Sequence, residues 1–176
     1  MKTTKIVLLG YMGSGKTAVG FLLNNYLKYK FWDLDHYLEA QWETSVSDIF
    51  KSKGELYFRE QERNALEHLL KDETPMVISL GGGTPCYYDT MSYLGTLDHV
   101  VTVYLKTQVL TLSQRLFNTQ QSRPLIAHLK GIDQIQEFVG KHLFERNVFY
   151  SQADYLVETD KKTVEIVTAE LAALLA

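Results

Sequence analysis

The chain has little cysteine, no long apolar run and no large excess of charge. Its 176 residues include one cysteine, Cys86, so no disulfide can form within the chain, and a reducing compartment fits. The apolar run near the start is only "IVLL", too short for a signal peptide or a membrane span. No other run approaches the roughly eighteen apolar residues that a span requires. We therefore expect a soluble cytoplasmic protein that does not bind a membrane.

Charge and composition exclude further classes. The formal net charge is −3, which gives no general reason to expect nucleic acid as a partner. The five histidines show no spacing typical of metal ligands. No repeat, low-complexity tract or linker rich in Pro, Gly or Ser interrupts the chain. A chain of this length, 45% hydrophobic and 22% charged, is predicted to form one globular domain.

Strand and helix patterns alternate along the chain. Short apolar runs predict strands at 5–10, 30–35, 76–80, 99–105 and 153–159. Helical spacing predicts helices at 16–27, at 37–70 with a break near 54, at 109–116, at 133–150 and at 164–174. This alternation is typical of a parallel sheet covered by helices on both faces. Such sheets bind ligands beyond the carboxyl ends of their strands, where the unusual loops of this chain fall.

The loop after the first predicted strand, "GYMGSGKT" (Gly10–Thr17), matches the pattern G-x-x-x-x-G-K-[ST]. Backbone N–H groups of such a loop point at phosphate oxygens, Lys16 reaches the β- and γ-phosphates, and the Thr17 hydroxyl binds Mg²⁺. The alternative, a glycine-rich turn that binds nothing, fits poorly with a match between a strand and a helix. The chain lacks both the guanine motif of GTPases and the strand ending in Asp-Glu of motor ATPases.

Two acids, Asp33 and Asp35, end the next predicted strand in "FWDLD". Alternate residues of a strand share a face, so both carboxylates are expected to reach one site. One beside Mg²⁺ and one beside a substrate hydroxyl would be a sensible division. A solvated strand end followed by a helix cap is the alternative.

Three arginines are candidates for binding an anion. A guanidinium grips a carboxylate with two parallel hydrogen bonds, so Arg59 and Arg146 together could select a small carboxylate. A surface ion pair is the alternative for each, because acidic residues lie nearby in the sequence. Arg123 lies in a long irregular segment typical of a lid, from which it could neutralise a transferring phosphoryl group.

Three glycines in a row, Gly81–Gly83, follow the apolar run "MVISL" in "SLGGGTP". A bare backbone allows a ligand to approach closely and offers N–H groups to it. A turn that needs positive φ is the alternative.

Together "GYMGSGKT", "FWDLD", "GELYFRE", "SLGGGTP", "SRPLI" and "FERNVFY" resemble the shikimate kinase family, in order and spacing, from near the N-terminus to about Tyr155. The resemblance implies an α/β, three-layer αβα P-loop fold of the nucleoside-monophosphate-kinase type, with a parallel five-stranded sheet. It implies a single domain over 1–176, a lid at about 117–131 and a substrate-binding helical region at about 36–71.

The resemblance also implies an activity and a set of residues. The family transfers the γ-phosphoryl group of ATP to the 3-hydroxyl of shikimate, with one Mg²⁺ per subunit, on the route to chorismate and the aromatic amino acids. It is usually monomeric, with ATP and shikimate as its partners. The implied residues are Gly13, Ser14, Gly15, Lys16, Thr17 and Ala18 around the ATP phosphates, Thr17 and Asp33 at the metal, Asp35 as candidate base and shikimate ligand, Arg59 and Arg146 on the shikimate carboxylate, Gly81, Gly82 and Gly83 on the shikimate ring, and Arg123 closing over ATP.

Two other functions stay open from the sequence. One is a kinase of the same fold that acts on gluconate or a nucleoside monophosphate, and the other is a nucleotide-sensing module without a substrate. The adenine contact is open between Arg115, Lys161 and another residue.

Overall fold

A computed structural model describes residues 4–120, 123 and 125–175 of the chain. Its centre is a five-stranded sheet with the strand order β2-β3-β1-β4-β5, in which every pair of neighbours is parallel. The strands are β1 (Lys5–Leu9), β2 (Lys30–Asp33), β3 (Met76–Ser79), β4 (Val100–Lys106) and β5 (Tyr155–Glu158). The predicted parallel α/β fold is therefore confirmed.

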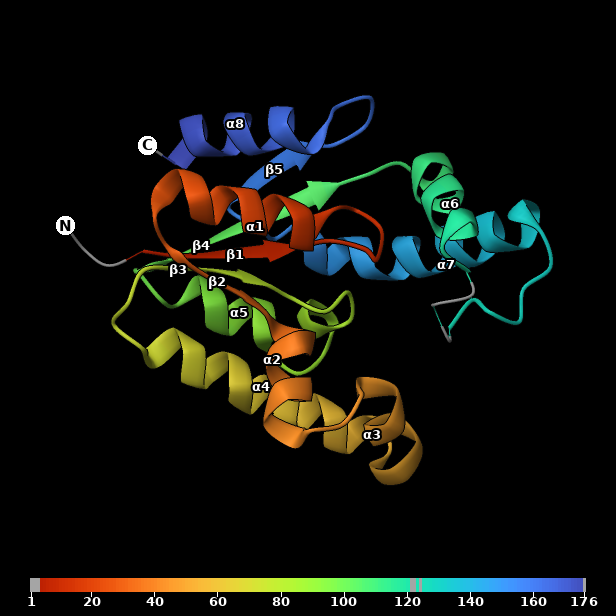
Figure 1. Cartoon of the computed structure of the whole chain (residues 1–176), viewed down its shortest axis with the longest axis horizontal. Coiled ribbons are helices and arrows are strands. Elements are labelled where there is room, and N and C mark those ends of the chain that lie inside the picture. The colour runs from red at the N-terminus through yellow and green to blue at the C-terminus, as the bar shows by residue number, and fades with distance from the viewer. Residues whose placement is uncertain (1–3, 121–122, 124, 176) are drawn as a thin grey trace.

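Helices cover both faces of this sheet, which gives three layers (Figure 1). They are α1 (Lys16–Leu27), α2 (Leu34–Trp42), α3 (Val46–Lys53), α4 (Glu55–Lys71), α5 (Thr90–Gly95), α6 (Val109–Asn118), α7 (Ile132–Tyr150) and α8 (Val164–Leu175), with a 3-10 turn, η1 (Thr84–Cys86). Helices α1 and α8 lie on one face, and α4, α5 and α7 lie on the other. The short elements η1 and α5 were not predicted.

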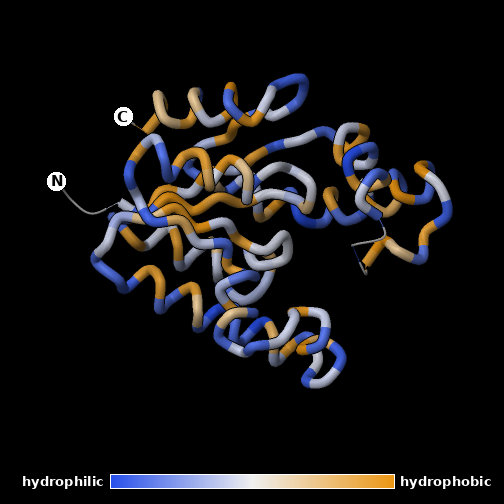
Figure 2. The backbone as a smooth tube through the Cα atoms, viewed as in Figure 1, coloured by the Kyte–Doolittle hydropathy of each residue, from blue (hydrophilic) through white to orange (hydrophobic). Residues whose placement is uncertain are grey.

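The core consists of two apolar clusters, one on each face of the sheet. Along β1, Ile6 and Leu8 belong to the cluster under α1 and α8, whereas Val7 and Leu9 belong to the opposite cluster. This alternation follows from the two-residue period of a strand. Figure 2 shows the hydrophobic strands at the centre of the molecule. Burial on both faces explains why the central strands β3, β1 and β4 read as apolar runs.

The prediction that "FWDLD" forms one strand was wrong at its end. Strand β2 stops at Asp33, which is the N-cap of α2 and accepts a hydrogen bond from the backbone N–H of His36 at 3.5 Å. Asp35 therefore lies in the first turn of a helix, and not on a strand face shared with Asp33. An N-cap aspartate satisfies an N–H group that has no partner within the helix, which favours ending the strand here.

The segment between α6 and α7 is irregular, as predicted, but it begins after Asn118 rather than at residue 117. Within it Ile126 is fully buried. Arg123 is described, whereas residues 121, 122 and 124 of the predicted lid lie outside the described residues.

Among the helices of the described residues, none has the length and apolar character that crossing a membrane requires.

Candidate active site

The P-loop, Gly10–Thr17, joins the carboxyl end of β1 to the first turn of α1. Gly13 and Gly15 adopt φ values of 84° and 97°, which favour glycine. Lys16 is 8% exposed and donates hydrogen bonds to the carbonyl oxygens of Gly10 at 2.8 Å and Tyr11 at 3.1 Å. Burial lowers the pKa of Lys16 to about 8. The loop thus presents a buried amine, which two carbonyl groups hold, beside a helix N-terminus.

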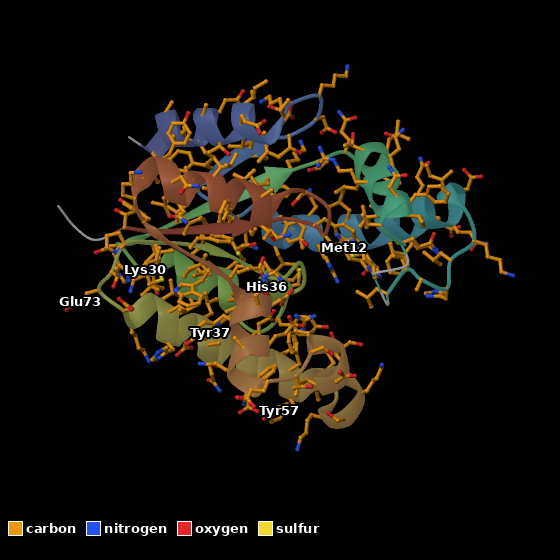
Figure 3. All side chains as sticks on the ribbon, viewed as in Figure 1. Met12, Lys30, His36, Tyr37, Tyr57 and Glu73 are labelled. Carbon is orange, nitrogen blue, oxygen red and sulfur yellow. The ribbon has the colours of Figure 1, made fainter. Side chains whose placement is uncertain are left out.

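The structure brings four of the other predicted charged residues close to Lys16, and Arg59 is not one of them. The carboxylates of Asp35 and Asp33 oppose the lowering of its pKa, whereas the cations Arg123 and Arg146 add to it. These residues come from the start of α2, the segment after α6 and the middle of α7. Figure 3 labels Met12 of the P-loop and His36, which follows Asp35 on α2. Segments distant in sequence therefore meet beyond the carboxyl ends of the strands.

Thr17 and Asp33 form a pair of oxygen ligands beside the P-loop. The Thr17 hydroxyl donates a hydrogen bond to Asp33 Oδ2 at 2.7 Å. Asp33 pairs in register with Ser79 of β3, whose buried Oγ has no hydrogen-bond partner among the described residues. The described residues contain no cluster of three or more His, Cys, Asp or Glu side chains that could hold a metal by themselves. Two oxygen ligands fit a Mg²⁺ ion that phosphate oxygens and water also coordinate.

Asp35 is a carboxylate with an environment that disfavours its charge. Burial, the largest cause, and the neighbouring carboxylates of Glu62 and Asp33 together raise the pKa of Asp35 to about 6. Lys16 and Arg59 oppose this rise. A buried carboxyl group that titrates close to neutral pH is suited to accepting a proton in a reaction.

Arg59 does form ion pairs with acids near it in sequence, as the alternative expected, but the pair with Glu62 is buried and not at the surface. Its guanidinium donates to Glu62 Oε2 at 2.9 Å and to Glu55 Oε1 at 3.3 Å. The Tyr87 ring lies 4.3 Å from the guanidinium carbon, and the Tyr87 hydroxyl donates to Glu55 at 2.6 Å. Among the described residues, the buried Nε of Arg59 has no hydrogen-bond partner. That orphan donor could be satisfied by a further anion.

Arg146 projects from α7 toward the same region. Its guanidinium carbon lies 5.4 Å from the centre of the Tyr11 ring. Tyr150, one turn further along α7, donates a hydrogen bond from its hydroxyl to the carbonyl oxygen of Gly82. Helix α7 therefore contacts both the P-loop and the glycine run.

Each glycine of the run lies next to one candidate residue. Gly81 is near Asp35, Gly82 is near Arg146, and Gly83 is near Arg59. A Cβ at Gly81 would lie 2.8 Å from Glu62 Oε1 and 3.1 Å from Asp35 Oδ1. At Gly82 it would lie 3.5 Å from an Nη atom of Arg146, and at Gly83 2.5 Å from an Nη atom of Arg59.

Space, and not backbone conformation, therefore explains Gly81 and Gly83, whereas a Cβ at Gly82 would make only ordinary contacts, the nearest at 3.4 Å. The glycines that adopt positive φ are Gly10, Gly13, Gly15, Gly54 and Gly131, and the run 81–83 is not among them. The alternative of a turn that needs positive φ is thus wrong. Glycine at these positions lets the acid and both arginines approach one stretch of backbone.

A hollow adjoins the P-loop on the side of α8. It has a volume of about 470 Å³, and its lining includes Arg115, Thr159, Lys162 and Val164. Arg115 donates a hydrogen bond to the carbonyl oxygen of Gly13 at 3.0 Å, and Lys162 pairs with Glu170 at 2.7 Å. Lys161, a candidate from the sequence, does not line this hollow.

Sequence reasoning missed several polar neighbours of the candidate residues. Glu62 was considered only as a surface partner of Arg59, although it is 1% exposed and also accepts a hydrogen bond from the Thr84 hydroxyl at 2.6 Å. Its spacing of three residues from Arg59 places both on one helix face and was the available signal. Tyr11 and Tyr87 contact candidate residues that lie far from them in the sequence. No local sequence pattern reveals such contacts.

Comparisons with known proteins agree with this geometry. Residues 12–176 match the family model described as shikimate kinase. The chain is 40% identical over 171 residues to a shikimate kinase of Flavobacterium psychrophilum, which covers 97% of this chain and 98% of the relative. It is 39% identical over 172 residues to the shikimate kinase of Flavobacterium johnsoniae, with 98% of this chain and 99% of the relative covered.

Solved structures give the same result. The crystal structure of shikimate kinase from Bacteroides thetaiotaomicron has a TM-score of 0.88 and 36% identity and covers 98% of each chain. Shikimate kinase from Acinetobacter baumannii, solved in complex with shikimate, has a TM-score of 0.84 and 29% identity and covers 98% of this chain and 93% of its own. The fold, the P-loop and these relatives together show that the chain belongs to the shikimate kinase family.

Proposed function

We propose that this chain transfers the γ-phosphoryl group of Mg·ATP to the 3-hydroxyl of shikimate, giving shikimate 3-phosphate and ADP. The observation that carries the proposal is the convergence of Asp35, Arg59 and Arg146 on the glycine run, next to Lys16. Two guanidinium groups suit one carboxylate, and a nearby buried carboxyl group suits an acceptor hydroxyl. Shikimate carries both groups.

The nucleotide is assigned to the P-loop and to the hollow beside it. Backbone N–H groups from Gly13 to Ala18 bind the phosphates, and Lys16 leaves its two carbonyl partners to bind the β- and γ-phosphates. Adenine lies in the hollow beside Arg115. The hydrogen bond from Arg115 to the carbonyl oxygen of Gly13 holds this side chain next to the P-loop. Family membership implies a divalent metal, and the oxygen pair of Thr17 and Asp33 supports Mg²⁺ in particular.

When bound, Mg²⁺ neutralises charge on the phosphate oxygens. Thr17 and Asp33 would hold it, Thr17 directly and Asp33 through water. The described acids around the site are too few to hold a metal without the nucleotide, so metal and ATP are expected to bind together.

The acceptor site divides the remaining work among the other side chains. Arg59 and Arg146 hold the carboxylate, and both guanidinium groups lie next to the glycine run. Asp35 binds the acceptor hydroxyl and takes its proton as the new P–O bond forms. Its pKa of about 6 leaves it ionised at neutral pH but basic enough to accept a proton. Lys16 and Arg123 neutralise the charge that develops on the phosphoryl group.

The remaining features of the proposal concern the whole molecule. Segment 117–131 acts as a lid that brings Arg123 over ATP, and 36–71 is the acceptor-binding helical region of a single domain. Arg123 lies near Lys16, which supports its proposed role over ATP. We further propose a monomeric, cytoplasmic enzyme whose partners are ATP and shikimate.

A coupled assay of ADP release tests the reaction. Purified protein with Mg·ATP is given shikimate, quinate, gluconate, AMP or no acceptor. ADP release that depends on shikimate, together with phosphorylated product, supports the proposal. Turnover with another acceptor alone would leave the nucleotide site assigned correctly but would contradict the assignment of the acceptor site to shikimate. ATP binding without any turnover would favour a nucleotide-sensing module.

A further inference from the structure

Tyr11 belongs to two parts of the site at once. Its backbone lies in the P-loop, where its carbonyl oxygen accepts hydrogen bonds from Lys16 Nζ and from the backbone N–H of Ser14, both at 3.1 Å. Its side chain is 1% exposed and extends to helix α7. One residue therefore contacts both the lysine of the nucleotide site and the helix that carries Arg146.

The side chain of Tyr11 makes two contacts with α7. Its hydroxyl and Nδ1 of His142 are 3.2 Å apart, and its ring centre lies 5.4 Å from the guanidinium carbon of Arg146. His142 and Arg146 are four residues apart and share one face of the helix. The Phe138 ring, 4.1 Å from the His142 ring, packs against that face one turn earlier. The imidazole and the guanidinium thus border the same tyrosine.

The charges around this contact favour a neutral hydrogen bond. Burial raises the pKa of Tyr11 to about 12, so its hydroxyl remains protonated. Burial and the nearby Arg146 lower the pKa of His142, against the opposing effect of Glu145, and so favour the neutral imidazole. The tautomer of that ring decides which of the two atoms donates. A buried hydroxyl that loses its only partner is costly, so this bond holds the ring in place.

We propose that Tyr11 is a positioning residue for Arg146, and that its hydrogen bond to His142 fixes the P-loop against α7. This inference rests on the proposed function, in which Arg146 binds the carboxylate of the acceptor. Gly82 also lies next to Arg146 and to the P-loop, since a Cβ at Gly82 would be 3.5 Å from the guanidinium and 3.4 Å from the backbone nitrogen of Met12. A shift of the Tyr11 ring therefore moves Arg146 relative to the acceptor-binding backbone.

Two substitutions separate the hydroxyl of Tyr11 from its ring. Tyr11→Phe removes the hydroxyl and is expected to raise the KM for shikimate about fivefold, since one net hydrogen bond corresponds to roughly that factor. Tyr11→Leu also removes the aromatic surface under Arg146 and should raise this KM by more than about tenfold. In both variants the KM for shikimate should change by a clearly larger factor than kcat or the KM for ATP.

Two double variants test the coupling. His142→Leu should reproduce Tyr11→Phe, and the two together should be no worse than either, because both break one bond. In an Arg146→Lys background, Tyr11→Phe should change the shikimate KM less than about twofold, because the positioned fork is already absent. Steady-state kinetics and shikimate titration by calorimetry measure each effect.

Tyr104→Phe is the matched control. Tyr104 is also a buried tyrosine that reaches α7, with its hydroxyl 3.5 Å from Asn147 Oδ1 and its ring 5.1 Å from that of Tyr150. It should leave the shikimate KM unchanged. Equal losses for ATP and shikimate in the Tyr11 variants, or a full Tyr11→Phe effect in the Arg146→Lys background, would overturn the positioning role. An unchanged shikimate KM in Arg146→Lys itself would instead overturn the carboxylate role of Arg146 and the inference with it.

Discussion

Replacing Asp35 by asparagine should stabilise the protein while it removes activity. The carboxylate of Asp35 is buried beside the carboxylates of Glu62 and Asp33, so its charge is unfavourable in the folded state. Asparagine keeps the shape and removes the charge. Groups selected for chemistry commonly cost stability in this way, so the variant separates a catalytic role from a structural one.

The magnitude follows from the pKa. Burial and the two neighbouring carboxylates raise the pKa of Asp35 from 3.8 to about 6, a change of about two units at about 1.36 kcal/mol each. The folded state prefers the protonated form, so the ionised group costs stability above the folded-state pKa. At pH 8 Asp35→Asn should therefore raise the free energy of unfolding by about 3 kcal/mol. As the pH falls through 6 the wild-type group becomes neutral as well, and at pH 4.5 the gain should be only about 1 kcal/mol.

Urea denaturation at pH 8 and pH 4.5 measures both values, and the coupled assay measures turnover. We expect kcat to fall by at least about 100-fold, the usual contribution of a general base. Glu60→Gln, which removes an exposed carboxylate from α4, is the control and should change stability by less than about 0.5 kcal/mol. An Asp35→Asn protein that is less stable than wild type at pH 8, or that keeps its turnover, would refute the reasoning.

Three further predictions concern the same site. In Gly83→Ala the new Cβ would lie 2.5 Å from the Arg59 guanidinium, so the shikimate KM should rise at least about tenfold with little change in melting temperature. Gly140→Ala, with open space around it in the interior of α7, should leave this KM unchanged and raise the melting temperature, and equal KM values in the two variants would exclude the steric explanation. Thr17→Val removes the hydroxyl that donates to Asp33 and should raise the Mg²⁺ concentration for half-maximal activity about tenfold, and an unchanged Mg²⁺ titration would argue against this ligand. Below pH 6 the kcat/KM for shikimate should fall about tenfold per pH unit as Asp35 is protonated, and a profile flat to pH 5 would exclude Asp35 as the base.

Much of the fold could be predicted because its signals are local. The strand β1, the P-loop and the helix α1 follow one another directly, and their boundaries lie within a residue of the prediction. The break between α3 and α4 occurs at Gly54, whose φ of 84° favours glycine. These features depend on the hydrophobic period and on backbone conformation, which neighbouring residues determine.

The candidate site was predicted less completely, because its contacts join distant segments. Asp33 and Asp35 were expected to share a strand face, but the cap of α2 ends the strand between them. Both still act on Lys16 through their charges, so the two acids do lie near one point, although they do not share a strand face as expected. The reason for the glycine run was also open from the sequence, since the atoms that leave no room for a side chain at Gly81 and Gly83 belong to α2, α4 and η1.

The central claim is that Arg59 and Arg146 bind the carboxylate of the acceptor beside the glycine run. The most direct measurement compares kcat/KM for shikimate with that for its neutral carboxamide, in wild type and in Arg59→Ala. Two charge-assisted hydrogen-bonding groups should give the wild type a preference for the acid of at least about 100-fold, and Arg59→Ala should reduce that preference at least about tenfold. The same preference in both proteins, or none in the wild type, would contradict the assignment.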